Sequence, residues 1–176
     1  VFYYPWTEVP YDCSSPNVHC VPVEYPTIDS ALTISASGDT IFISSGVFNE
    51  RGLEVNQNLL IVGSGMDSTI IDGQNLPPRV FTTDNLASGD TIRAMHFTVR
   101  HGLDTTSTVH GSRSAAGWQV YNINGTVMLE SVKFESCTSL TAAGAVGSWL
   151  GELIIDHSYF EDNYLSLIHI SEPTRP

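Results

Sequence analysis

Short apolar runs separated by turn residues fill the stretch Tyr25–Gly73, and no other feature constrains the fold of this chain as strongly. TIFI, LEV, LLIV and TII are each too short for an ordinary helix, and clusters of Gly, Asp, Ser and Asn lie between them. The pattern leaves room for one helical turn near Ile28–Ile34. A unit built from such short strands cannot bury its apolar face alone, so many units must stack.

Two short motifs recur at related spacings. ASGDTI occurs unchanged at Ala36–Ile41 and Ala87–Ile92, and AAG occurs at Ala115–Gly117 and Ala142–Gly144. The interval between the AAG copies is about half the interval between the ASGDTI copies. A period of about 26 residues fits both intervals and predicts one solenoid coil per repeat. Gly, Asn and Asp at the corners of the coils supply the left-handed backbone conformations that a sharp bend requires.

Apolar segments that end in phenylalanine follow the same period. Phe134 and Phe160 close two similar segments, LESVKF and IDHSYF, one period apart. The segment IRAMHF ends at Phe97, and a loop-rich insertion near Gly102–Arg113 accounts for the longer interval from Phe97 to Phe134. We therefore align the three phenylalanines as equivalent positions of successive coils.

These patterns predict an all-β fold, a solenoid whose short strands stack in parallel register over a continuous apolar column. A β-sandwich is the alternative, because its strands are also separated by turns. The sandwich predicts hairpins and alternating residues but no recurrence at a fixed period, so the recurrence favours the solenoid.

Composition divides the chain into three segments. Residues 1–24 are rich in aromatic residues and proline, which favours a cap over the open end of the solenoid. The aromatics that would form this cap, or alternatively a sugar-stacking platform, are Phe2, Tyr3, Tyr4, Trp6 and Tyr11. Residues 25–164 hold the coils. Residues 165–176 begin LSLIHISEPTR, which resembles the in-frame translation of a sequencing adapter, and we exclude them from the fold. We expect the natural chain to be truncated here and to continue beyond Tyr164 with further coils.

The three cysteines and one asparagine carry covalent expectations. Cys13 and Cys20 bracket the turn-like loop SSPNVH, so they form either a disulfide in an oxidising compartment or two free thiols. Cys137 is expected in the interior as a small apolar residue, unless its partner lies beyond Tyr164. Asn124-Gly-Thr is a glycosylation sequon if a eukaryote secretes the protein, although Asn-Gly is equally suited to a tight turn.

The chain is acidic, with a net charge of −12 and only 7 Lys and Arg residues. The acidic residues are scattered, as on a solvated surface, and do not form a tail. There is no basic stripe to meet phosphates, which argues against nucleic acid as a partner. The longest apolar runs are about four residues, far below the roughly 20 that a membrane-spanning helix needs.

Three short motifs follow one another within Tyr25–Gly73: GDTI, Gly46-x-Phe48-x-Glu50 and GSG-x-x-x-TIIDG. In this order they resemble the opening coils of the pectin-lyase-like right-handed parallel β-helix proteins. Asn58–Gly73 is also similar to the corresponding coil of pectin methylesterases. The resemblance implies a right-handed parallel β-helix that is extracellular.

Later motifs have a different likeness. Phe134-Glu-Ser-Cys137, Gly144-Ala-Val and Phe160-Glu-Asp-Asn163 resemble the FxxN and GGAI repeats of polymorphic outer membrane proteins. Cys137 departs from the usual Asn, and an alanine replaces the first Gly. By analogy, this resemblance implies a structural, adhesive or carbohydrate-binding role at the cell surface, with a polysaccharide or cell-surface glycan as partner.

The motifs that catalysis requires in these families are missing. The pectin methylesterase resemblance implies QAVAL, QDTL and DFIFG motifs, and none of them occurs in Thr91–Tyr164. We therefore assign no catalytic residue, expect no cofactor, and interpret the chain as a segment of a non-enzymatic secreted or cell-surface protein. The alternative is a carbohydrate-active enzyme, related to pectin methylesterases or polysaccharide lyases, whose catalytic coils are absent from this sequence.

Trp118 and Trp149 are the candidates for ligand contact. Each follows an AAG segment, so equivalent coil positions would place both on one face, where stacked aromatic rings bind sugars. Packing against the flank of the column is the other interpretation.

Neither the histidines nor the acidic residues predict a metal site. His96, His101 and His110 lack the spacing of a zinc site and are interpreted as surface residues. A loose cluster near the last coil is interpreted as solvated turn residues and not as a Ca²⁺ site: Asp156, His157, Glu161 and Asp162.

Overall fold

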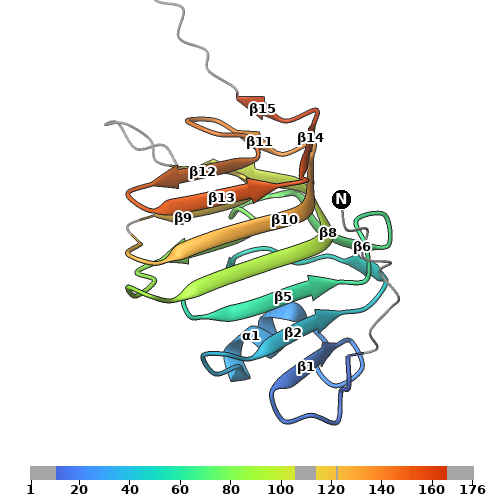
Figure 1. Cartoon of the computed structure of the whole chain (residues 1–176). Coiled ribbons are helices and arrows are strands. Elements are labelled where there is room, and N and C mark those ends of the chain that lie inside the picture. Colours follow the sequence, from blue (N-terminus) through green and yellow to red (C-terminus); the bar gives the residue numbers. More distant parts are fainter. Residues whose placement is uncertain (1–10, 106–113, 122, 166–176) are drawn as a thin grey trace, which may run out of the picture.

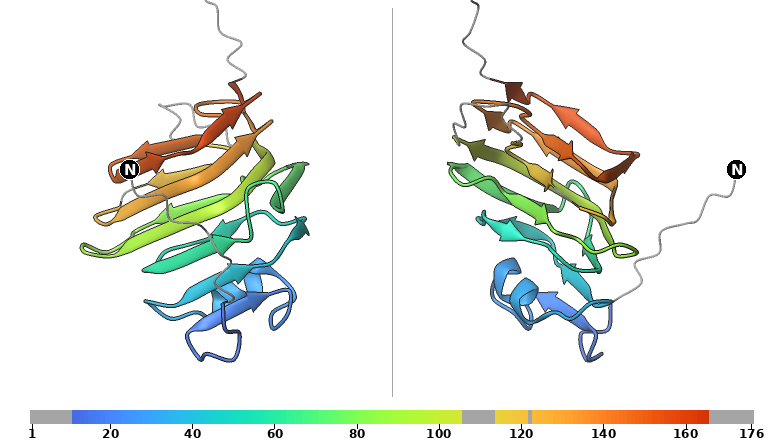
Figure 2. Two further views of the ribbon diagram at one scale, coloured as in Figure 1. Left: turned by 45° about the vertical axis from the view of Figure 1, so that its right-hand side comes forward. Right: turned by 90° about the vertical axis from the view of Figure 1, so that its left-hand side faces the viewer.

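The computed structural model describes residues 11–105, 114–121 and 123–165, and Figures 1 and 2 show them as a stack of short strands. These residues form one helix, α1 (Ile28–Ile34), and 15 strands. The strands are β1 (Val18–Val21), β2 (Thr40–Ile43), β3 (Gly46–Phe48), β4 (Leu53–Glu54), β5 (Leu59–Gly63), β6 (Thr69–Leu76), β7 (Phe81–Asp84), β8 (Thr91–Asp104), β9 (Trp118–Tyr121), β10 (Thr126–Glu135), β11 (Thr138–Ser139), β12 (Val146–Trp149), β13 (Glu152–Asp156), β14 (Tyr159–Glu161) and β15 (Tyr164–Leu165).

Neighbouring strands of each sheet come from successive turns of the chain. β1, β2, β5, β8, β10 and β13 lie side by side in that order (Figure 1), and β4, β7, β9 and β12 form a second sheet. A third set of strands pairs in parallel in the same way. In order, it consists of β3, β6, the second half of β8, the second half of β10 and β14. Every strand pair in the described residues is parallel. The strand content confirms the all-β prediction, and the parallel pairing is consistent with a β-solenoid. The β-sandwich predicts antiparallel hairpins, which these strand pairs contradict.

Inward side chains of successive strands stack in register and form the core. Ile41, Ile61, Ala94 and Leu129 occupy one such column, and all four are buried. Each Å² of apolar surface removed from water contributes about 25 cal/mol, so this column is a main source of stability. Ile155, the next member, is 41% exposed because no described strand pairs with β13 on its outer side.

Helix α1 begins and ends at the predicted residues and lies at the β1 end of the stack (Figure 2). Its inner side chains, Ile28, Ala31 and Leu32, are buried in the core cluster. The described chain has no strand here that could pair with β4, so the apolar face of a short helix covers this end of the column.

The stack begins earlier than expected. β1 lies within residues 1–24, the segment interpreted as a cap, and pairs with β2 along its whole length. Tyr11 stacks on Phe42 with ring centroids 5.0 Å apart, so one of the expected capping aromatics packs on the outside of β2. The other four, Phe2, Tyr3, Tyr4 and Trp6, lie outside the described residues, as does most of the adapter-like segment.

The coils differ in length more than predicted. Successive register partners along the first sheet are His19, Ile41, Ile61, Ala94, Leu129 and Ile155. The shortest of these intervals runs from Ile41 to Ile61, and the longest runs from Ala94 to Leu129. The alignment of Phe97 with Phe134 is wrong, because Phe97 pairs with Val132 and Phe134 pairs with Val99. Phe134 and Phe160 do pair, with ring centroids 5.5 Å apart.

Residues in the left-handed conformation bend the strands at two recurring corners. One corner carries positive φ at His96 (63°), Ser131 (52°) and His157 (45°), and the second carries it at His101 (50°), Ser136 (51°) and Asp162 (50°). The two copies of ASGD form the same turn, with φ of +97° at Gly38 and +89° at Gly89, which glycine adopts without strain. The repeated motif is therefore a correct indication of a recurring corner.

Candidate functional site

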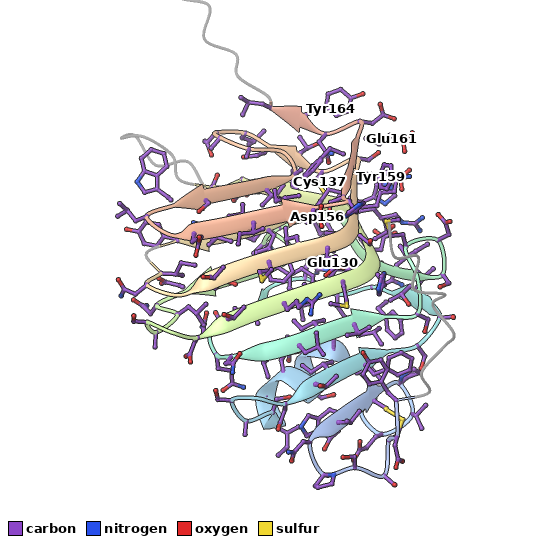
Figure 3. The ribbon with its side chains drawn as sticks, viewed as in Figure 1. Glu130, Cys137, Asp156, Tyr159, Glu161 and Tyr164 are labelled. Atoms are coloured by element: carbon purple, nitrogen blue, oxygen red, sulfur yellow. A yellow bond between two sulfur atoms is a disulfide. The ribbon has the colours of Figure 1, made fainter. Side chains whose placement is uncertain are left out.

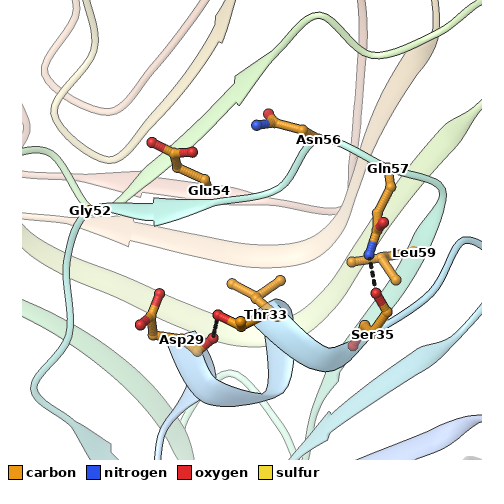
Figure 4. A pocket seen from close by; sticks show the side chains of 9 residues that line it. Asp29, Thr33, Ser35, Gly52, Glu54, Asn56, Gln57 and Leu59 are labelled. Carbon is orange, nitrogen blue, oxygen red and sulfur yellow. Dashed lines mark hydrogen bonds between the residues drawn. The ribbon is translucent and has the colours of Figure 1, made fainter.

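A polar groove of about 500 Å³ lies between α1 and the segment that contains β4 (Figure 4). One wall is the helix, and the other is the chain from Gly52 to the start of β5. The lining residues are Asp29, Leu32, Thr33, Ser35, Gly52, Glu54, Asn56, Gln57 and Leu59.

Hydrogen bonds to its first turn fix the helix wall. The Glu50 carboxylate accepts from the backbone N–H groups of Ile28 (2.8 Å) and Asp29 (3.0 Å), and Thr27 and Ser30 form a capping box. These bonds satisfy N–H groups that have no partner inside the helix, and the negative charge suits the positive end of the helix dipole. Asp29 therefore lines the groove from a well-anchored first turn.

Strand alternation places the polar side chains of the other wall. Leu53 and Val55 are fully buried, so Glu54 and Asn56 face away from the core and line the groove. The sequence LEVN thus supplies one apolar face for the column and one polar face for the groove.

Two further bonds tie this wall to its surroundings. Gln57 Nε2 donates to the backbone oxygen of Ser35 at 2.7 Å, next to the end of α1, as Figure 4 shows. The backbone N–H of Asp84 donates to Asn56 Oδ1 at 2.9 Å from the neighbouring coil. Since both walls are held by long-range hydrogen bonds, the groove is largely preformed.

Several polar groups of the groove have no protein partner within the described part of the chain. These groups are the side-chain carboxylates of Asp29 and Glu54, the Oε1 atom of Gln57 and the Nδ2 group of Asn56. Carboxylate and amide oxygens accept hydrogen bonds and an amide nitrogen donates them, so the lining suits a ligand rich in hydroxyl groups. Two carboxylates in one groove also favour a neutral ligand over an anionic one.

The prediction that Trp118 contacts a ligand is wrong. Its side chain is 0% exposed, its ring stacks on Phe81 with centroids 4.3 Å apart, and Nε1 donates to Thr83 Oγ1 at 3.0 Å. Trp149 pairs in register with Tyr121, three positions after Trp118, so the two tryptophans are not equivalent. Trp149 is 45% exposed, and a ligand contact there stays a prediction.

Cys13 and Cys20 are joined by a disulfide with Cα atoms 5.7 Å apart. Cys137 is buried as an unpaired thiol, and burial raises its pKa to about 11. Asn124 is exposed two residues before the start of β10, and its glycosylation stays a prediction.

All four residues of the acidic cluster near the last coil are exposed, and Figure 3 shows Asp156 and Glu161 on the last described coil. Asp156 Oδ1 lies 2.9 Å from His157 Nδ1, and Glu161 Oε2 lies 2.7 Å from Lys133 Nζ, so two of its carboxylates have partners of their own. Within residues 11–105, 114–121 and 123–165, no group of three His, Cys, Asp or Glu side chains is arranged to hold a metal ion. His110 lies outside these ranges.

Sequence patterns do not single out the groove. The alternation of Leu53, Glu54, Val55 and Asn56 marks the polar pair as outward-facing, but it does not show which element they face. Asp29 and Glu54 belong to different elements of the chain, and only the packing of α1 against the strand segment brings the two to one groove.

No family model matches the chain, and neither the curated proteins nor the solved structures contain a significant match. None of the helical residues that the structure describes forms a segment long and apolar enough to cross a membrane. The parallel fold and the groove are therefore the observations from which a function can be inferred.

Proposed function

We propose that this chain is a segment of an extracellular or cell-surface right-handed parallel β-helix protein that binds a carbohydrate. The groove between α1 and β4 is the proposed binding site. The observation that carries this proposal is the set of carboxylate and amide groups in the groove that lack protein partners among the described residues. Sugar hydroxyls donate and accept hydrogen bonds, so a mixed lining of this kind matches them.

The contacts of Asn163 support the β-helix part of the proposal. Its Oδ1 accepts from the backbone N–H of Cys137 (3.0 Å), and its Nδ2 donates to the backbone oxygen of Phe134 (2.9 Å). The side chain thus bridges the last two described coils at the Asn of the FxxN-like motif. The Cys13–Cys20 disulfide supports an oxidising, extracellular location.

The charge of the groove narrows the ligand class. Asp29 and Glu54 place two carboxylates in one groove, on a chain with a net charge of −12. A uronate-rich polysaccharide would meet like charges there, whereas a neutral oligosaccharide would not. Neutral glycans are therefore the proposed ligands.

The test is a screen of neutral oligosaccharides, followed by calorimetric titration of each one that binds. We expect Glu54→Gln and Asn56→Ala each to weaken binding about five- to tenfold, the effect of one net hydrogen bond worth about 1 kcal/mol. Asp162→Asn is the matched control, because it removes an exposed carboxylate at the other end of the stack. Unchanged affinity in both groove variants would contradict the proposal.

A second candidate function, a carbohydrate-active enzyme, is favoured by the pair of carboxylates in the groove. Glycosidases use two carboxyl groups, one as the acid and the other as a base or nucleophile. Release of reducing sugar from a bound oligosaccharide, abolished by Asp29→Asn and by Glu54→Gln, would support it. Binding without any turnover would leave the binding role alone.

A further inference from the structure

Basic side chains gather at one corner of this acidic chain. The structure describes five Lys and Arg residues, and three of them occupy the corner at which β3, β6 and the second half of β8 end. Arg51 lies between β3 and β4, Arg79 lies between β6 and β7, and Arg100 lies in β8. The register of β6 and β8 places Arg100 directly beside Asp72 (β6 and β8 are neighbours in Figure 1).

Asp72 holds Arg100 in a fixed orientation. Its carboxylate is 7% exposed and accepts from Arg100 Nε (2.7 Å) and from the backbone N–H of Gln74 (2.8 Å), with His101 Nδ1 at 3.1 Å. Burial alone would raise the pKa of Asp72, but the hydrogen bonds from Arg100, Gln74 and His101 outweigh it and hold this pKa below the ordinary value. Asp72 is therefore ionised at neutral pH.

The rest of the Arg100 guanidinium remains available. Its bond to Asp72 uses only Nε, the side chain is 30% exposed, and the described residues provide no partner for its two terminal nitrogens. Those nitrogens carry four N–H donors in one plane. The Asp72 carboxylate thus occupies the Nε side of the guanidinium, and the donors of the terminal nitrogens stay open. This geometry suits the binding of a second oxyanion in addition to the carboxylate of Asp72.

Arg51 approaches the same segment from the preceding coil. Its Nη1 lies 3.4 Å from Gln74 Oε1, and its Nε donates to the backbone oxygen of Pro77 at 3.2 Å. Both of these partners are neutral oxygens. By contrast, Arg79 is paired with Asp104 at 3.2 Å, and the remaining described cations, Arg93 and Lys133, also have carboxylate partners.

We propose that Arg51 and Arg100, with His101 beside them, bind a small oxyanion group: a carboxylate, a sulfate or a phosphate. The corner also contains Glu135, the register partner of Arg100 on β10. The three arginines together with Asp72, Asp104 and Glu135 leave a net charge of about 0, on a chain whose net charge is −12. The planar donors of one guanidinium match the spacing of two oxygens on one such group. The two arginines are linked through the same segment of β6, because Arg51 contacts Gln74 and Arg100 contacts Asp72. This corner uses none of the residues of the groove, so it does not depend on the proposed carbohydrate site.

The test is a titration of the full 176-residue chain with sodium phosphate, sodium sulfate and sodium acetate at constant ionic strength. Binding is monitored through the arginine Nε–Hε signals in NMR spectra. We expect saturable shifts of the Arg51 and Arg100 signals with at least one anion. Arg51→Gln should weaken binding about fivefold, the effect of one solvent-exposed charge contact. Arg93→Gln, which removes a charge paired with Glu130 on β10, is the matched control and should bind like the unmodified chain.

Arg100→Lys tests the geometry apart from the charge. It keeps one positive charge but loses the planar fork, so binding should weaken although the net charge is the same. Circular dichroism would show that each variant is folded. A preference for sulfate and phosphate assigns a tetrahedral anion, and equal or tighter binding of acetate assigns a carboxylate. The absence of saturable shifts in the unmodified chain, or equal binding by Arg51→Gln and Arg93→Gln, would overturn the proposal.

Discussion

Replacing Trp118 by alanine removes the largest fully buried side chain in the described part of the molecule. Deleting a buried tryptophan costs about 3–5 kcal/mol through lost burial and the cavity left behind. The fully buried Thr83 hydroxyl also loses its indole donor, which adds about 1 kcal/mol. The expected loss in free energy of unfolding is therefore about 4–6 kcal/mol.

The assay is thermal and urea denaturation of three variants beside the unmodified chain. At about 2–4 °C per kcal/mol for a domain of this size, Trp118→Ala should lower Tm by roughly 8–24 °C. Trp118→Phe keeps a ring against Phe81 but lacks the N–H, so we expect about 1–3 kcal/mol. Trp149→Ala is the matched control and should cost about 1 kcal/mol or less, because that side chain is 45% exposed. Equal destabilisation by Trp118→Ala and Trp149→Ala would refute the core assignment of Trp118.

Three further predictions concern ionisable groups and cysteines. In the folded state the hydrogen bond from His19 is the main cause that lowers the pKa of Asp39. The pair therefore stabilises the fold at pH values above the unfolded-state carboxyl pKa, and this contribution should be lost as pH falls through the lower folded-state pKa. Asp39→Asn should flatten that part of a curve of stability against pH. Reduction of the Cys13–Cys20 disulfide should cost about 2–3 kcal/mol, seen as a lower urea midpoint with a thiol reductant, whereas an unchanged midpoint would contradict it. Cys137 should react with a thiol reagent only after denaturation, because burial raises its pKa to about 11, and rapid labelling of the native chain would show otherwise.

Local patterns predicted the local elements of this fold. The helix at Ile28–Ile34 and the two ASGD turns depend on residues close together in the chain, and both formed as expected. The parallel, all-β arrangement also followed from short strands that cannot be stable alone.

Register could not be predicted in the same way, because unequal loops change the spacing between coils. Phe97 and Phe134 look equivalent in the sequence, yet they are offset by two residues in the sheets. The two tryptophans after AAG are offset by three positions, which makes one a core residue and leaves the other exposed. Strand pairing is decided by the whole inward face of a coil, and a single shared residue type does not fix it.

The groove depends entirely on long-range packing. Glu54 and Asn56 are recognisable as outward-facing, but the helix that faces them is held there by Glu50 and Gln57 through bonds that span 21 or 22 residues. The corner proposed to bind an oxyanion likewise joins Asp72 and Arg100 across 28 residues. Without the register of β6 and β8, nothing in the sequence pairs these two side chains.

Amide chemical-shift mapping with a neutral oligosaccharide tests the central claim most directly. Binding in the groove predicts that the largest shifts of the ¹H–¹⁵N signals fall on Asp29–Ser35 and on Gly52–Leu59, with little change in β9 and β12. Shifts centred on Trp149 and its neighbours in β12, or no shifts in the helix and the β4 segment at saturating ligand, would contradict the account.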